Sequence, residues 1–267
     1  MKIGIVGCAG RMGRMLVKAV HETPGAELAG GTEAPHSDAI GEDPAVLAGL
    51  PASGLQIIDD AKGLFEVSDA VVDFTAPAAT VRHALFAAET GTALIPGTTG
   101  LSADDQAKIE EAAKAVAIVQ AANYSVGVNV LLGLARQAAE MMGPEFDIEI
   151  LEMHHRHKVD APSGTALALG KAVADGRGVD LDKVSDRVRD GHTGERKVGN
   201  IGFATLRGGM VVGDHSVIFA SDDERVEITH KAADRGLFAK GAIRAALWTE
   251  GKAPGLYSMR DVLGLKG

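Results

Sequence analysis

The densest group of chemically reactive side chains lies past the middle of the chain. The run His154-His-Arg-His-Lys158 places three histidines, an arginine and a lysine within five residues. An imidazole titrates near neutral pH and suits proton transfer, and a lysine ammonium is a compact positive charge that attracts anions. The whole chain carries a net charge of −9, so this concentration of cations favours a substrate with more than one carboxylate.

A helix start should follow this cationic run. The segment Pro162-Ser-Gly-Thr165 is typical of a helix N-terminus, with Asp160 as the cap and Pro162 in the first turn. Gly164 and Thr165 would then present backbone N–H groups and a hydroxyl, which bind carboxylates at helix N-termini. Lys158 and His155 would add positive charge and hydrogen-bond donors beside them.

The histidines allow two other interpretations. Neighbouring strand residues face opposite sides, so His154 and His155 would not share a metal ion. The sequence has only one cysteine, Cys8, and no His-Glu-x-x-His motif, so we expect no metal site. A solvated group of surface histidines remains the plain alternative.

A glycine-rich loop stands at the start of the chain. Gly7-Cys-Ala-Gly10-Arg-Met-Gly13 directly follows an apolar strand and opens a helix. Glycines there allow a tight turn, close approach of a pyrophosphate, and close helix packing, while the helix N-terminus faces the phosphates. The spacing departs from Gly-x-Gly-x-x-Gly because Ala9 occupies the middle position. An ordinary strand-to-helix turn is the alternative, but the position after a first strand favours dinucleotide binding.

Glu33 stands 20 residues after Gly13, at the end of the second expected strand. A carboxylate there accepts hydrogen bonds from ribose hydroxyls and repels a 2′-phosphate. Ala34 follows, without a nearby lysine or arginine, so the loop favours NADH over NADPH. The turn Pro96-Gly-Thr-Thr-Gly100 should lie at the same edge of the sheet and could hold nicotinamide or substrate, or be a plain turn.

The elements that must position these residues change in character near residue 125. Before it, short apolar strands alternate with helices, which predicts a doubly wound parallel sheet of the Rossmann type. The expected strands span 2–7, 27–31, 55–58, 69–74, 93–95 and 117–120, and the helices span 11–21, 77–89 and 103–115. Ser102 and Asp105 form the pattern of a capping box before the last of these helices.

The second half predicts an α+β domain with a mixed, largely antiparallel sheet. Helices are expected at 126–142, 165–174 and 237–250, and strands at 147–154, 201–206, 210–212, 215–220 and 225–230. We therefore expect a dinucleotide-binding domain over 1–125 and a substrate-binding and oligomerisation domain over 126–235. The C-terminal segment 236–267 should pack back on the first domain.

The run from His154 through Lys158 to Thr165-Ala closely resembles the signature of the 4-hydroxy-tetrahydrodipicolinate reductase family, also called dihydrodipicolinate reductases. Four further blocks are similar to those of the family and extend the resemblance over the whole chain: Val6-Gly-Cys-Ala-Gly-Arg-Met-Gly13, Gly97-Thr-Thr-Gly100, Ala121-Ala-Asn-Tyr-Ser-Val-Gly-Val-Asn129 and Glu227-Ile-Thr-His-Lys-Ala232.

The resemblance implies an oxidoreductase of lysine (diaminopimelate) biosynthesis that forms a homotetramer. It would reduce 4-hydroxy-tetrahydrodipicolinate to tetrahydrodipicolinate with NADH or NADPH and loss of water. His154 then matches the proton donor and Lys158 a second donor and substrate anchor. His155, Gly164 and Thr165 match contacts to the substrate carboxylates, and Arg235 is a further candidate.

The resemblance also implies the cofactor contacts: Gly7, Cys8, Ala9, Gly10, Arg11, Met12, Glu33, Gly97, Thr98, Thr99, Ala121, Ala122, Asn123 and Tyr124. Ala34 departs from the family, because many members that use NADPH have an arginine at that position.

The amino-acid composition excludes further classes of protein. No apolar run approaches the ~20 residues that a membrane span needs, and the acidic balance disfavours nucleic acid as a partner. One cysteine allows no intrachain disulfide, which fits a reducing cytoplasm. Two alternatives stay open: another two-domain dehydrogenase of amino-acid metabolism, such as an aspartate or homoserine dehydrogenase, and a dinucleotide sensor without catalytic activity.

Overall fold

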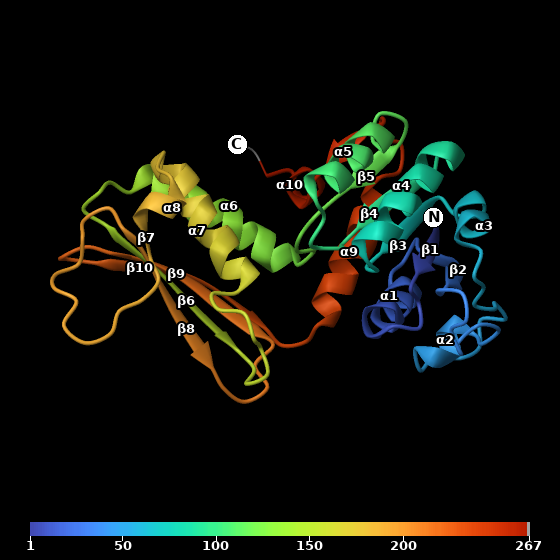
Figure 1. Cartoon of the computed structure of the whole chain (residues 1–267), viewed down its shortest axis with the longest axis horizontal. Coiled ribbons are helices and arrows are strands. Elements are labelled where there is room, and N and C mark those ends of the chain that lie inside the picture. Colours follow the sequence, from blue (N-terminus) through green and yellow to red (C-terminus); the bar gives the residue numbers. More distant parts are fainter. Residues whose placement is uncertain (266–267) are drawn as a thin grey trace. The chain divides into compact units, whose positions relative to one another are not determined.

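The computed structural model describes residues 1–265, which fold into two compact units (Figure 1). The first unit comprises Met1–Val126 and the segment that begins at Gly236, and the second comprises Gly127–Arg235. The expected C-terminal segment ran to 267, and its residues 266 and 267 lie outside the described part of the chain. None of the helices formed by residues 1–265 combines the length and apolar character needed to span a bilayer.

The first unit is built on a six-stranded parallel sheet, which confirms the doubly wound prediction. Its strand order is β11-β5-β4-β3-β1-β2. The strands are β1 (Lys2–Val6), β2 (Glu27–Thr32), β3 (Ala70–Asp73), β4 (Ala93–Pro96), β5 (Ala117–Val119) and β11 (Gly255–Tyr257). Every residue of β3 and β4 is buried, as expected for a parallel sheet that is covered on both faces.

Helices cover the two faces of this sheet. Alternate residues of β3 show the division: Val72 packs with α1 and α9, whereas Val71 packs with α3, α4 and α5. The helices are α1 (Arg11–Glu22), α2 (Pro44–Leu47), α3 (Ala61–Glu66), α4 (Pro77–Thr90), α5 (Ala103–Ala112), α9 (Gly236–Trp248) and α10 (Met259–Leu263). The predicted capping box is confirmed at α5, where Ser102 Oγ accepts from the Asp105 amide and Asp105 accepts from the Ser102 amide.

Helix α9 approaches the backbone of the first unit closely. A Cβ at Gly241 would lie 1.8 Å from the Tyr124 carbonyl oxygen, so only glycine fits there. The segment after residue 235 thus contributes α9 to the core around α1 and the sheet.

One expected strand of the first unit is wrong. Residues 55–58 form only an isolated bridge, between Ile58 and Thr32. The reason is that the Ile57 backbone is already paired with a loop: its N–H donates to Glu42 and its carbonyl accepts from Gly41.

The second unit is a mixed sheet with helices on one face. Its strand order is β10-β9-β6-β8-β7; β6 is antiparallel to β9 and parallel to β8. The strands are β6 (Asp147–His154), β7 (Ser185–Asp186), β8 (Ile201–Arg207), β9 (Gly213–Ala220) and β10 (Arg225–Ala232), and the helices are α6 (Val126–Met141), α7 (Gly164–Arg177) and α8 (Leu181–Val184). Ile148 and Ile150 of β6 pack with Leu131 of α6 and Leu169 of α7.

The expected strand at 210–212 is also wrong, because β9 begins only at Gly213. The preceding glycine turn bonds to the chain that follows β6 instead: the Gly208 amide donates to the His154 carbonyl, and the Arg156 amide donates to the Gly209 carbonyl. This turn therefore lies beside the cationic run.

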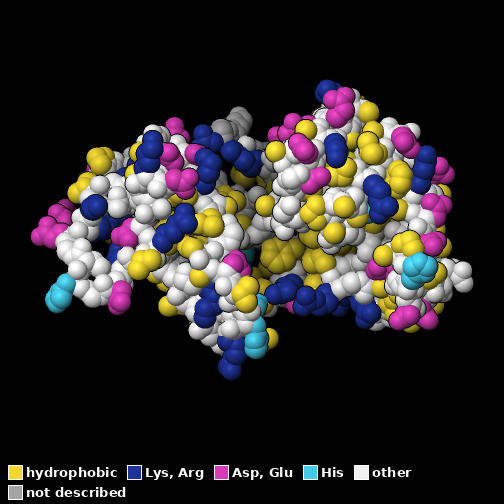
Figure 2. All heavy atoms as spheres, in the orientation of Figure 1, with side chains coloured by type: hydrophobic (Ala, Val, Ile, Leu, Met, Phe, Trp, Pro, Cys, Tyr) yellow, Lys and Arg dark blue, Asp and Glu magenta, His cyan; other side chains and the backbone are white. Residues whose placement is uncertain are grey.

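Acidic and basic side chains are interspersed on the face drawn in Figure 2, over both units. That face carries no broad basic surface of the kind that binds a nucleic-acid backbone.

Candidate active site

The glycine loop adopts the geometry that its sequence predicts. Gly7 has a φ of +69°, which favours glycine, and its amide donates to the Thr32 carbonyl at 2.8 Å. A Cβ at Gly13 would lie 2.1 Å from the Gly7 carbonyl oxygen, so α1 can pack against the loop only with glycine there. Two of the three glycines are thus required by the local backbone.

Glu33 binds this loop directly. Its Oε1 accepts a hydrogen bond from the Ala9 amide at 2.8 Å, which anchors the carboxylate beside the loop. The Cys8 side chain is fully buried below it, and burial together with the Glu33 charge raises the pKa of the thiol to about 12. Cys8 is therefore a neutral packing residue at neutral pH, whereas Glu33 presents an acceptor at the edge of the sheet.

A cavity of about 580 Å³ lies at the carboxyl ends of β1, β2 and β3, and Gly7, Gly10 and Glu33 line it. Its volume is in the range of small-molecule sites (roughly 300–1,000 Å³), and this edge of a doubly wound sheet is where such ligands bind. Lys62 and Arg82 also line the cavity, from α3 and α4. Neither cation was predicted as a site residue, because the spacing of residues after Ala34 does not reveal cations that come from α3 and α4.

A buried hydrogen-bonded pair, which was not predicted from the sequence, joins His83 of the cavity wall to Asp73 behind it. His83 Nδ1 lies 2.8 Å from Asp73 Oδ2, and Asp73 Oδ1 accepts from the amide and the hydroxyl of Thr75. Burial alone would raise the pKa of Asp73, but the hydrogen bonds and charge of His83 and the bonds from Thr75 lower it. The ionised carboxylate thus fixes the turn after β3, which lines the cavity.

The other predicted cofactor residues follow β4 and β5 at the same edge of the sheet. A Cβ at Gly97 would lie 2.4 Å from the Phe74 ring, and Thr98 Oγ1 accepts from Thr80 Oγ1 at 2.7 Å. The buried Tyr124 hydroxyl lies 2.5 Å from the Val119 carbonyl and 3.0 Å from that of Pro96. The Tyr124 side chain therefore ties β4 to β5, while Ala121, Ala122 and Asn123 form the loop before it.

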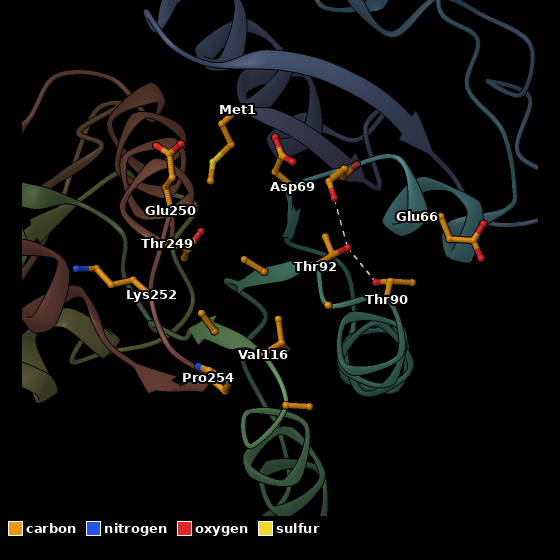
Figure 3. A pocket seen from close by; sticks show the side chains of 16 residues that line it. Met1, Glu66, Asp69, Thr90, Thr92, Val116, Thr249, Glu250, Lys252 and Pro254 are labelled. Atoms are coloured by element: carbon orange, nitrogen blue, oxygen red, sulfur yellow. Dashed lines mark hydrogen bonds between the residues drawn. The ribbon is translucent and has the colours of Figure 1, made fainter.

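A second cavity of the first unit, about 540 Å³, opens at the opposite edge of the sheet (Figure 3). Asp69, Ala93 and Ala117, which stand at the amino ends of β3, β4 and β5, line it. Its hydroxyls are engaged with each other and with the backbone: Thr90 Oγ1 donates to Thr92 Oγ1, and Thr92 Oγ1 donates to the Phe65 carbonyl. This cavity is separate from the glycine loop.

In the second unit, β6 carries the candidate site residue His154 on the face that the helices cover. Ile148, Ile150, Glu152 and His154 are buried, while the residues between them are partly exposed. Because strand side chains alternate between the two faces, these four residues share one face of β6, which is apolar at its start and polar at its end. His154 is 9% exposed and Glu152 is 1% exposed.

Glu152 is the centre of a buried hydrogen-bond network. Its Oε2 lies 2.5 Å from His154 Nδ1 and 2.8 Å from Arg207 Nη1, and its Oε1 accepts from Arg207 Nη2 at 2.9 Å and from the Ser163 amide at 3.0 Å. Burial would raise the pKa of this carboxyl, but hydrogen bonds from Arg207, His154 and Ser163 lower it. Glu152 is therefore ionised beside His154.

The start of α7 differs from the prediction. Ser163, not Asp160, is the N-cap, because its Oγ accepts from the Ala166 amide, and Pro162 precedes the helix rather than standing in its first turn. Asp160 instead pairs with Lys158, at 2.8 Å. Gly164 and Thr165 are the first two residues of α7, and a Cβ at Gly164 would meet no atom within 4 Å. The space beside this N-terminus is therefore open.

The remaining predicted substrate residues lie near the end of β6. His155 Nε2 is 3.4 Å from Arg235 Nη2, and burial together with the Arg235 charge lowers the pKa of His155. Lys158 lies in the loop between β6 and α7, and its side chain is one-fifth exposed. The structure thus places cations, an imidazole and a helix N-terminus around the carboxyl end of one strand.

His215 of β9 was not predicted as a site residue. Its Nε2 lies 3.0 Å from Ser163 Oγ, and its ring centre is 5.0 Å from that of His154. Burial and the neighbouring His154 lower its pKa to about 4, so it is neutral at neutral pH. Its Nδ1 has no hydrogen-bond partner within residues 1–265.

Some of these missed residues could have been found from the sequence. Glu152 is two residues before His154, so a strand must place both on one face. Arg207 and His215 come from β8 and β9, whose pairing with β6 cannot be deduced from local spacing.

The histidines do not gather around a common point. The rings of His155 and His157 are 6.2 Å apart, and among the described residues no group of three or more His, Cys, Asp or Glu side chains is arranged to hold a metal ion.

Comparisons with known proteins cover both units. Residues 1–124 match the family model of the dihydrodipicolinate reductase N-terminus, and residues 127–263 match that of its C-terminus. The chain is 54% identical over 265 residues to the 4-hydroxy-tetrahydrodipicolinate reductase of Rhodopseudomonas palustris strain HaA2, covering 99% of this chain and 98% of that protein. It is also 54% identical over 267 residues to the reductase of that name from Parvibaculum lavamentivorans, covering 100% and 98%.

Solved structures share the fold. A dipicolinate-bound dihydrodipicolinate reductase from Paenisporosarcina sp. TG-14 superposes with a TM-score of 0.76 at 23% identity, covering 97% of each chain. A probable dehydrogenase from Thermotoga maritima gives 0.63 at 14% identity, covering 98% of this chain and 92% of its own. The family models and the relatives, over nearly the whole length, establish that this chain belongs to the dihydrodipicolinate reductase family.

Proposed function

We propose that this chain reduces 4-hydroxy-tetrahydrodipicolinate to tetrahydrodipicolinate with a reduced nicotinamide dinucleotide, as a step of lysine (diaminopimelate) biosynthesis. The observation that carries the proposal lies at the carboxyl end of β6. His154 ends this strand, Lys158 lies in the loop that follows it, and this loop leads to the open N-terminus of α7. Family membership supports the same reaction, because the relatives bear the name of this reductase.

The residues of the second unit fit the two halves of the substrate's chemistry. A ring with two carboxylates needs cations and N–H donors, which Lys158 and the amides of Gly164 and Thr165 offer. His155 and Arg235 are further contacts for the carboxylates. Loss of the 4-hydroxyl as water leaves a conjugated C=C–C=N system, and His154 delivers the proton to the atom where negative charge develops on reduction.

The first unit fits the cofactor. The glycine loop, the Glu33 carboxylate and the cavity at the carboxyl edge of the sheet suit the pyrophosphate and ribose of a dinucleotide. Bound there, the reduced nicotinamide supplies the hydride. Gly97, Thr98 and Thr99, with the loop from Ala121 to Tyr124, would position the nicotinamide end.

We propose that the protein uses both dinucleotides and prefers NADH. Glu33 accepts from ribose hydroxyls and disfavours a 2′-phosphate, and Ala34 supplies no positive charge. Arg82, which lines the same cavity, offers a cation through which NADPH would still bind.

We further propose that the protein forms a homotetramer, as the family resemblance implies, and that it acts in the cytoplasm, where a chain with one cysteine and no intrachain disulfide fits the reducing conditions. Light scattering coupled to size exclusion should give the mass of four chains, and a monomer at working concentration would contradict this.

The test of function is oxidation of NADH and NADPH by the purified protein with freshly generated 4-hydroxy-tetrahydrodipicolinate. Turnover that depends on this compound is expected, whereas pyruvate or aspartate semialdehyde alone should give none. Tight NADH binding without turnover would support a dinucleotide sensor, and turnover with another amino-acid precursor would indicate a different dehydrogenase.

A further inference from the structure

The contacts of Glu152 exceed what a packing role requires. It is a nearly fully buried carboxylate that accepts hydrogen bonds from three elements: β6 through His154, β8 through Arg207, and the start of α7 through Ser163. A buried charge is stable only while its partners stay in place, because the loss of one partner leaves part of the charge uncompensated. Its position is therefore well defined relative to the imidazole.

Arg207 divides its contacts between the two carboxylate oxygens. Nη1 approaches Oε2, the same oxygen that His154 Nδ1 approaches, and Nη2 approaches Oε1. A two-point contact of this kind fixes both the rotation and the position of a carboxylate. It also offsets part of the negative charge that His154 experiences.

We propose that Glu152, oriented by Arg207, is a positioning residue for His154. The carboxylate holds the proton of the imidazole on Nδ1, which leaves Nε2 as the nitrogen that passes a proton to the substrate, and it stabilises the doubly protonated ring. This inference rests on the proposed function, in which His154 is the proton donor.

The proton balance of such a step is simple. Protonated His154 gives its Nε2 proton to the substrate as the hydride arrives from the reduced dinucleotide, and the neutral ring keeps its proton on Nδ1, hydrogen-bonded to Glu152. Water then returns a proton to Nε2. Glu152 gains and loses no proton, so its task is orientation and charge stabilisation, comparable to the carboxylate that orients the histidine of a serine-protease triad.

Other charged or titratable groups surround His154 and set its response to pH. They are Glu152 on the same strand, Arg207 on β8, His215 on β9, and His155, Lys158 and Asp160 in the segment after β6. Arg207 and Glu152 act in opposite directions: the carboxylate favours the charged imidazole and the guanidinium disfavours it. Removing either charge should therefore move the pH dependence in opposite senses.

The experiment measures the pH profile of kcat/KM for the wild type, Glu152→Gln and Arg207→Gln. The donor must be protonated, so activity falls on the basic side. Without the Glu152 charge this basic limb should move to lower pH by about half a unit or more, with a 10- to 100-fold loss of kcat. Without the Arg207 charge it should move to higher pH. A purely structural role would lower the rate without moving the limb.

Glu149→Gln is the matched control. Glu149 lies on the same strand and binds Arg189 by two hydrogen bonds, at 2.8 and 2.9 Å, but it faces away from His154. Its substitution should leave the basic limb in place. A shift equal to that of Glu152→Gln would show a general charge effect and would overturn the inference.

A second measurement needs no substrate. NMR spectra of protein labelled with ¹⁵N-histidine report which ring nitrogen is protonated, and comparison with His154→Gln assigns the His154 signals. In the wild type, the neutral His154 ring should carry its proton on Nδ1. In Glu152→Gln this preference for Nδ1 should be lost. If the wild type lacks reductase activity, the proposed function fails, and this spectrum alone decides the role of Glu152. If activity is present but Glu152→Gln changes neither the limb nor the tautomer, the inference fails alone.

Should Glu152→Gln not fold, Arg207→Gln decides by the sign of its shift. An unmoved limb, or a move to lower pH, would overturn the inference. Glu152→Asp, which keeps the charge at shorter reach, should retain the wild-type limb and recover part of kcat.

Discussion

At the scale of single residues, the chemistry depends on a few groups whose environments differ sharply. His154 and His215 have rings 5.0 Å apart, yet only His154 contacts a carboxylate, while His215 is buried against Ser163 and neutral. One imidazole is thus provided with the partner that stabilises its charged form and the other is not. This difference supports the proposal that His154 is the residue that transfers the proton.

Replacing the donor should affect turnover more than binding. His154→Gln is expected to lower kcat by ~10²–10⁴ with a small change in KM, because general acid catalysis typically contributes that much. The steady-state assay with 4-hydroxy-tetrahydrodipicolinate measures both constants. His157→Gln, an exposed histidine three residues later, is the control and should retain activity. Wild-type turnover in His154→Gln would exclude it as the donor.

The proposed preference for NADH over NADPH also depends on single residues, which substitution can test. Arg82→Ala should raise the KM for NADPH several-fold and leave that for NADH nearly unchanged, because only NADPH carries a 2′-phosphate. Lys114→Ala, on an exposed lysine outside the cavity, should change neither. Equal effects on both dinucleotides would remove Arg82 from the phosphate site. Ala34→Arg should shift the preference toward NADPH.

At the scale of elements, the sequence is informative where one strand or helix suffices. The fully buried strands β3 and β4 are continuous apolar runs between turn residues, so the parallel sheet could be predicted, as could the capping box of α5. Strands β7 and β11 have two and three residues, too few for any period, and exist only through their neighbours. Residues 55–58 have strand-like side chains, but a loop takes up their backbone groups.

The same distinction between local sequence and tertiary packing explains which residues of the candidate site could be predicted. The cationic run and its glycine-containing helix start are contiguous in sequence and were identified, whereas Arg207, His215, Lys62 and Arg82 reach their sites through tertiary packing. The sequence favours Asp160 as the helix cap because aspartate is a residue type that caps helices well. In the structure Asp160 is paired with Lys158, and Ser163 is the residue next to the first helical amides.

The burial of His215 of β9 against Ser163 at the start of α7 should make folding sensitive to acid. The pKa of His215 is about 4 in the folded protein and near 6.5 when unfolded, so the unfolded chain binds more protons as pH falls below 6.5. Stability from this group is complete above pH 6.5 and is lost toward pH 4, by roughly 2–3 kcal/mol at pH 4.5. Urea unfolding of His215→Gln should show a smaller loss between pH 7 and 4.5 than the wild type.

His192→Gln, an exposed histidine in a loop, is the control and should keep the wild-type dependence. An identical loss in His215→Gln and the wild type would mean that His215 does not titrate in this range.

At the scale of the whole molecule, an acidic chain must bind the anionic substrate of the proposed reaction. A net charge of −9 repels a dicarboxylate over most of the surface, so binding requires a local group of cations. In the proposed function each unit supplies one half of the reaction: the first would bind the dinucleotide at the carboxyl edge of its parallel sheet, and the second would bind the substrate carboxylates at the end of β6 and the start of α7.

The most direct measurement is calorimetric titration of pyridine-2,6-dicarboxylate (dipicolinate) into the NADH-loaded protein, wild type and Lys158→Ala. Lys171→Ala, whose ammonium also pairs with an aspartate at 2.8 Å but on the exposed side of α7, is the control. We predict one site per chain, with affinity weakened at least 10-fold, or ~1.4 kcal/mol, by Lys158→Ala alone. No binding to the wild type, or equal affinity in Lys158→Ala, would contradict the account.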